Sequence, residues 1–75
     1  MLKKCKITRY DESITEPPYE FIYLDEIEVD KPDQDHLGEE FYRILRDGCR
    51  DKGYTFKFYT MCSNDKNYDY QIVVY

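Results

Sequence analysis

Only one stretch of this sequence spaces its apolar residues as a helix does. Leu37, Phe41, Ile44, Leu45 and Gly48 recur at three- and four-residue steps, so they share one face of a helix. The segments before and after this stretch instead alternate with a period of two, or are rich in β-branched and aromatic residues, which predicts strands. One helix between two pairs of strands predicts an α+β domain of order ββαββ.

The helix is expected at about residues 32–52. Asp30 can cap its start, and Pro32 is tolerated in a first turn, where the missing N–H would have no partner. Gly53 is a natural stop, because glycine accepts the left-handed backbone that ends many helices. Gly48 lies on or beside the apolar face, which predicts a close approach of helix to sheet.

Four strands are expected, at residues 2–10, 19–29, 54–62 and 68–75. The alternation slips in the second strand, which predicts either a bulge near Asp25 and Glu26 or partial burial of both faces. The third strand places one set of side chains on one face (Tyr54, Phe56, Phe58, Cys62) and another on the opposite face (Lys57, Tyr59, Met61). The last two strands are separated by a turn cluster and are expected to form a hairpin.

A chain of 75 residues makes one domain, residues 1–75, with a small core. We expect a four-stranded, mostly antiparallel sheet with the helix packed on one face. Besides one face of the second strand, the predicted core consists of Cys5, Ile7, Leu37, Phe41, Ile44, Leu45, Phe56, Phe58, Ile72 and Val74.

The formal net charge of −5 is unevenly distributed along the chain. Residues 1–10 carry four bases and no acid, whereas residues 11–40 carry twelve acids and one base. Acids near a helix N-terminus complement the helix dipole, which accounts for part of this acidity but not for the acids on the second strand and first loop. The alternative is a docking surface for a basic partner, formed by Asp25, Glu26, Glu28, Asp30, Asp33, Asp35, Glu39 and Glu40.

One helix leaves the other face of a four-stranded sheet uncovered. By alternation, Tyr59, Met61, Val73 and Tyr75 are expected on this face, and Tyr10 and either Ile22 or Leu24 could join them. Tyrosine is frequent at protein interfaces, so Tyr59 and Tyr75 are candidate partner-binding residues. Homo-oligomerisation through this face is the alternative, since it would also enlarge a small core.

Nucleic-acid and membrane functions are weakly supported. The acidic balance argues against direct binding of duplex nucleic acid, which requires lysine and arginine to neutralise phosphates. An aromatic sheet face that stacks single-stranded RNA is a minor alternative, but the chain lacks a basic channel. The longest apolar runs have four residues, far below the ~20 that a transmembrane helix needs.

Chemistry is also weakly supported, and we expect no enzyme activity, cofactor or metal. His36 and Glu40 lie one helical turn apart, which is compatible with a small acid–base site, but a lone histidine there is typical of a solvated surface. No two of Cys5, Cys49 and Cys62 have the short spacing of a zinc site. An odd number of cysteines without a signal peptide is typical of free thiols in a reducing cytoplasm, where packing is their expected role.

These observations predict a small acidic interaction protein without catalytic activity. The concrete form is a stoichiometric inhibitor that occupies the basic nucleic-acid-binding surface of another protein. In size and charge the chain resembles the small acidic proteins, such as nucleic-acid mimics directed against restriction or CRISPR systems, that phages use against host machinery. That resemblance rests on no motif, and it implies a cytoplasmic location, in the host if the chain is phage-encoded.

Overall fold

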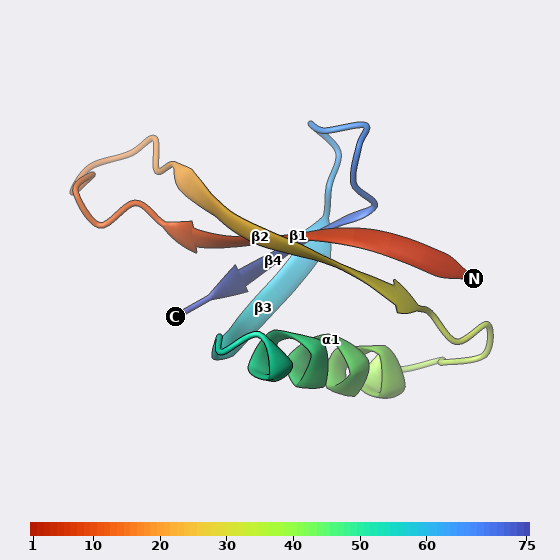
Figure 1. Cartoon of the computed structure of the whole chain (residues 1–75). Coiled ribbons are helices and arrows are strands. Elements are labelled where there is room, and N and C mark those ends of the chain that lie inside the picture. The colour runs from red at the N-terminus through yellow and green to blue at the C-terminus, as the bar shows by residue number, and fades with distance from the viewer.

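The computed structural model describes all of residues 1–75 and confirms the α+β class and the ββαββ order. The four strands form one sheet, and the single helix α1 lies against one of its faces (Figure 1). Along the chain the elements are β1 (Leu2–Tyr10), β2 (Phe21–Asp30), α1 (Glu39–Asp51), β3 (Phe56–Met61) and β4 (Tyr70–Val74).

The spatial order of the strands is β2-β1-β4-β3. β1 pairs with β2, and β3 with β4, in antiparallel fashion, whereas the central pair of β1 and β4 is parallel. This arrangement follows from α1, which carries the chain from one edge of the sheet to the other before the second hairpin forms. As a result β2 and β3 are the two edge strands, and the predicted mostly antiparallel sheet is confirmed.

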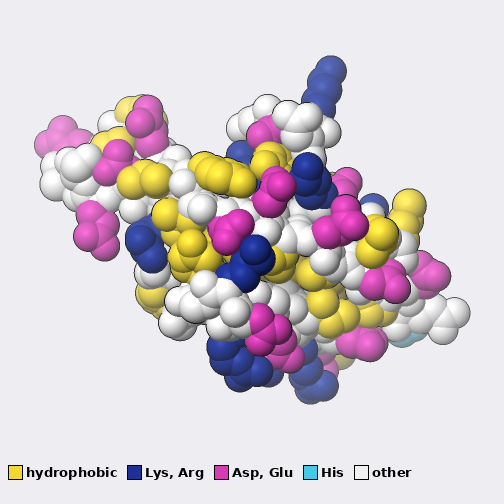
Figure 2. Space-filling view, viewed as in Figure 1, with side chains coloured by type: hydrophobic (Ala, Val, Ile, Leu, Met, Phe, Trp, Pro, Cys, Tyr) yellow, Lys and Arg dark blue, Asp and Glu magenta, His cyan; other side chains and the backbone are white.

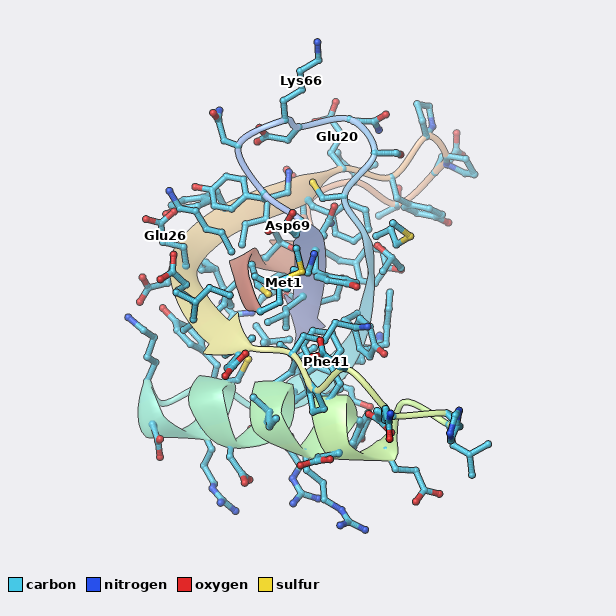
Figure 3. All side chains as sticks on the ribbon, turned by 90° about the vertical axis from the view of Figure 1, so that its right-hand side faces the viewer. Met1, Glu20, Glu26, Phe41, Lys66 and Asp69 are labelled. Carbon is cyan, nitrogen blue, oxygen red and sulfur yellow. The ribbon has the colours of Figure 1, made fainter.

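The core lies between α1 and the sheet. Gly48 makes the predicted close approach, because a Cβ atom placed there would lie 3.0 Å from Cδ1 of Ile27 on β2. Figure 3 shows Phe41 pointing from the helix toward the sheet. The buried cluster consists of Cys5, Ile7, Phe41, Leu45, Cys49, Phe56, Ile72 and Val74.

The predicted start of the helix is wrong by seven residues. Helix α1 begins at Glu39, after Gly38, whose φ of 72° is left-handed and interrupts any helix that starts earlier. The capping acid is Asp35 in place of Asp30, since its Oδ2 accepts the Phe41 N–H at 2.8 Å. Leu37 therefore lies outside the helix and is 82% exposed, so its assignment to the core is also wrong.

The predicted helix end is confirmed. Gly53 has a φ of 89°, and its N–H donates to the Arg50 carbonyl at 2.9 Å. Ile44, which was expected in the core, is only half-buried.

Bulges in both edge strands reset which side chains face the helix. In β2 the extra residue is Leu24, which confirms the predicted bulge next to Asp25. In β3 the register shifts between Phe56 and Phe58, which no sequence signal indicated. Phe58 pairs with Val73 and lies on the face away from α1, so its assignment to the core was wrong.

Past the β3 bulge, Tyr59 and Met61 lie on the helix side of the sheet. Tyr59 pairs with Ile72 of the core, and its ring lies 5.4 Å from that of Phe41. The prediction that Tyr59 and Met61 occupy the uncovered face is therefore wrong.

Candidate interaction surface

The sheet face opposite α1, here called the open face, is covered by no helix (Figure 1). Its most apolar part is an aromatic cluster of Tyr10, Phe21, Phe58 and Tyr75. The Tyr10 ring centroid lies 4.7 Å from that of Phe21 and 6.4 Å from that of Phe58. Lys57 Nζ lies over the rings of Tyr10 and Tyr75, at 5.0 and 5.3 Å. Phe21 is 42% exposed and Tyr75 is 67% exposed, so the cluster presents ring surface to solvent.

A polar groove of about 450 Å³ adjoins the aromatic cluster on the same face. At its floor, the buried Thr8 hydroxyl donates to the Ile72 carbonyl at 2.8 Å and accepts from Gln71 Nε2 at 3.2 Å. Because the Thr8 hydroxyl both donates and accepts a hydrogen bond, it is held in place by groups of the fold itself. The groove is lined by Lys6, Thr8, Glu20, Phe21, Tyr23, Asn64, Asp65 and Gln71.

The loop between β3 and β4 forms one wall of this groove and is tied to β1. The Asp69 N–H donates to the Lys4 carbonyl at 2.7 Å, and the Lys4 N–H donates back to Asp69 Oδ2 at 2.9 Å. Lys6 Nζ lies 3.8 Å from Asp65 Oδ2. Figure 3 shows Lys66 at the tip of the loop, pointing away from the sheet.

Tyr68 fixes the base of the same loop against β2. Its hydroxyl donates to Glu26 Oε2 at 2.6 Å, and this hydrogen bond raises the pKa of Tyr68 above its usual value. The ammonium groups of Lys4 and Lys6 lie 5.4 and 5.9 Å from the Tyr68 ring centroid. The wall of the groove is thus held by a charge-assisted hydrogen bond together with two cation–π contacts.

The acidic residues of β2 are not on one surface. Asp25 lies on the α1 side, where its Oδ2 is 3.4 Å from Lys52 Nζ. The Glu26 backbone N–H donates to Asp25 Oδ1 at 2.8 Å, and this bond is the main cause that lowers the pKa of Asp25. Partial desolvation opposes it, and Lys52 lowers the pKa further. Glu26 and Glu28 point to the open face, and Glu26 lies 3.8 Å from Lys4.

The other five predicted acids lie around the junction of β2 and α1. Asp30 pairs with the terminal amine of Met1, and Asp35 caps the helix. The remaining three are exposed and take part in no ion pair: Asp33, Glu39 and Glu40. Of the ten predicted partner-binding residues, the open face therefore carries Tyr75, Glu26 and Glu28.

A second acidic region, which the predicted site did not include, lies on the β1–β2 connection at residues 11–20. This segment carries four acids and no base. Figure 1 shows that it projects beyond the rest of the molecule, and Figure 2 shows acidic and hydrophobic side chains together at its tip. A pocket of about 310 Å³ lies here, lined by Tyr10, Asp11, Glu12, Ile14 and Tyr19. The signal that could have found it is the absence of any base in residues 11–20.

The candidate catalytic and metal-binding residues do not lie together in one site. His36 is exposed in the connection before α1, and no group of three or more His, Cys, Asp or Glu side chains is placed to hold a metal ion. The three thiols are free: Cys5 and Cys49 are buried in the core, whereas Cys62 is partly exposed. Burial raises the pKa of Cys5 to about 12, with the charge of Asp69 contributing, and raises that of Cys49 to about 11.

No protein-family model, curated protein or solved structure matches this chain. The one helix is too short and too polar to cross a membrane.

Proposed function

We propose that this chain is a non-catalytic binding protein that docks its open face and its acidic β1–β2 connection onto a basic surface of another protein. The observation that carries the proposal is the position of the aromatic cluster directly beside a projecting segment with four acids and no base. Rigid aromatic side chains supply contact area at low entropic cost, and surrounding carboxylates steer a basic partner into place.

The partner surface that this arrangement suits best is one that otherwise binds nucleic acid. Such surfaces are rich in lysine and arginine, because they neutralise phosphates. A small domain that presents carboxylates next to aromatic rings would occupy such a surface one to one and act as a stoichiometric inhibitor. In one form of this proposal the chain is a phage protein directed against host defence, and it then acts in the host cytoplasm.

The proposal is tested by binding at two salt concentrations. A partner captured from a cytoplasmic extract and identified by mass spectrometry should bind at least tenfold more weakly at about 500 mM salt than at about 50 mM. Its binding to nucleic acid should fall in proportion to the added chain and stop at one equivalent. Reversing the charge of Glu12, Glu16 and Glu20 to lysine should slow association by about tenfold, and Tyr75→Ala should cost about 1–2 kcal/mol of affinity.

The matched control is reversal of Glu39 and Glu40 to lysine, since these acids lie on α1, away from the open face. This variant should bind as the unmodified chain does. Equal binding at both salt concentrations would overturn the proposal. A dimer in light scattering that Tyr75→Glu dissociates would instead assign the open face to self-association.

Single-stranded RNA is a second candidate, which one observation favours. The Lys57 ammonium lies over the rings of Tyr10 and Tyr75, so the aromatic cluster carries its own positive charge. Anisotropy of labelled oligouridine measures this directly. Saturable micromolar binding that Lys57→Ala and Tyr10→Ala each weaken would support RNA as the ligand of the open face. If no such binding is seen, a basic protein remains the proposed partner.

A further inference from the structure

A second groove, of about 400 Å³, runs between α1 and the edge strand β3, on the side of the sheet opposite the open face. Tyr59 of β3 forms one wall, and Tyr42, Arg43 and Arg46 of α1 form the other. Leu37, the most exposed large hydrophobic residue of the chain at 82%, lies at one end. The proposed function uses none of these side chains.

The backbone of β3 that borders this groove has no partner on its outer side. β3 is the last strand of the sheet and pairs only with β4. The Cys62 N–H points to β4, because it donates to the Asp69 carbonyl at 3.1 Å. The backbone N–H and C=O groups of successive residues in a strand point alternately toward one side and the other. By this alternation the N–H and C=O groups of Tyr59 and Met61 point away from β4, toward the free edge.

The opposite edge of the sheet, by contrast, is protected. The bulge at Leu24 distorts β2, and the neighbouring Glu26 N–H donates to the Asp25 carboxylate at 2.8 Å, so this N–H is not free to pair with another strand. These are devices by which proteins keep an edge from pairing with another strand. β3 has its own bulge at Lys57, near the start of the strand, but from Phe58 to Met61 its pairing is regular and no side chain bonds to the outward N–H groups of Tyr59 and Met61. Met61 at the end of this stretch is 76% exposed.

The charge of the groove selects the sign of its occupant. Arg43 takes part in no ion pair, and Arg46 has only its sequence neighbour Asp47, with Nε and Oδ1 3.5 Å apart. One acid, Glu39, lies at the same groove, so the lining has a net positive charge. Figure 2 shows basic side chains gathered along the outer side of α1.

We propose that β3 binds an extended, acidic segment of another protein as a fifth strand of the sheet. The main chain of the segment pairs with the outward groups of Tyr59 and Met61. Its carboxylates lie on the α1 side of the sheet, against Arg43 and Arg46. This site is independent of the open face, so the two proposals fail separately.

The geometry also predicts the pattern of the segment. β3 has six residues, so the added strand would span about five residues, or ~17 Å. Side chains of a strand alternate between the two faces, and only every second one would reach α1. Carboxylates on alternate residues therefore all face α1, and the β-branched residues between them, which point to the open face, favour the strand conformation.

The test uses a fluorescein-labelled hexapeptide of alternating aspartate and valine, with a lysine–valine hexapeptide as the control. The aspartate peptide should bind the full chain and shift the amide NMR signals of Tyr59 and Met61, whereas the lysine peptide should not. Arg43→Glu combined with Arg46→Glu should weaken binding at least about tenfold, because two attractive contacts become repulsive. Arg50→Glu, near the far end of α1, is the matched control and should leave the affinity unchanged.

Met61→Pro tests the strand pairing itself. Proline removes the outward N–H without disturbing the ladder with β4, because the Met61 N–H is not part of that ladder. Binding of the aspartate peptide should weaken about tenfold, while the NMR spectrum of the free variant should show that it is still folded. Peptide binding that neither Met61→Pro nor the paired arginine reversal changes would overturn the proposal, as would shifts confined to the open face. A free chain that self-associates through Arg43 and Arg46 would overturn the assignment to another protein.

Discussion

Replacing Phe41 with alanine is expected to unfold most of the chain at room temperature. The Phe41 side chain is 1% exposed, and its ring centroid lies 5.4 Å from that of Tyr59 and 5.0 Å from that of Tyr70. Truncating a buried phenylalanine costs about 3–5 kcal/mol. A core of this size rarely supplies more than about 3–5 kcal/mol in total, so the loss equals the free energy of unfolding. Far-UV circular dichroism with urea titration measures the effect.

Leu37→Ala is the matched control for this variant. Sequence periodicity places Leu37 and Phe41 on the same helical face, but in the structure Leu37 is 82% exposed and precedes α1. Its truncation should change the free energy of unfolding by no more than about 0.5 kcal/mol. A loss for Leu37→Ala as large as that for Phe41→Ala would show that the helix starts near residue 32 and that the core extends to Leu37.

The order of the elements was predictable because each helix or strand repeats its apolar spacing over enough residues for one irregular position not to hide it. β1 was predicted with its observed bounds, since Cys5 and Ile7 alternate with Lys4, Lys6 and Thr8 in the middle of the strand. The helix start was not predictable from the same pattern. Leu37 continues the three- and four-residue spacing, and only the left-handed backbone of Gly38 reveals that the helix begins after it.

The candidate site was harder to predict than the fold, because a bulge moves every later side chain of a strand to the other face. In β3 the regular alternation of Phe56 and Phe58 carries no sign of the bulge at Lys57, so Tyr59 was assigned to the wrong face. Tyr75 was assigned correctly, because the spacing from Ile72 and Val74 in β4 is regular.

The acidic tract shows a second limit of sequence reasoning. Asp25 and Glu26 are adjacent in the sequence, yet a strand sends them to opposite faces of the sheet, where they bond to Lys52 and to Tyr68. A run of like charges in a sequence is therefore not a charged surface when the run lies on a strand. The β1–β2 connection is different, because Glu12, Glu16 and Glu20 are all exposed on the projecting segment regardless of their spacing.

Raising the pH is expected to unfold the chain between about pH 9 and pH 11. In the folded state burial raises the pKa of Cys5 to about 12 and that of Cys49 to about 11, from an ordinary value of 9.0. Above pH 9 the unfolded chain therefore binds fewer protons than the folded one, and stability falls as the pH rises. The two thiols together reduce the free energy of unfolding by about 2–3 kcal/mol per pH unit, which exhausts a core of this size near pH 11.

The hydrogen bond that Tyr68 donates to Glu26 acts in the same direction, because it also holds a proton that the unfolded chain releases earlier. Circular dichroism between pH 7 and pH 12 records the transition, and Cys49→Ala should roughly halve the slope of stability against pH above pH 9 by removing one of the two buried thiols. Cys62→Ala, at a partly exposed position, should leave the midpoint unchanged. If Cys49→Ala and Cys62→Ala gave the same slope as the unmodified chain, the buried thiols would not be the groups that limit stability at high pH.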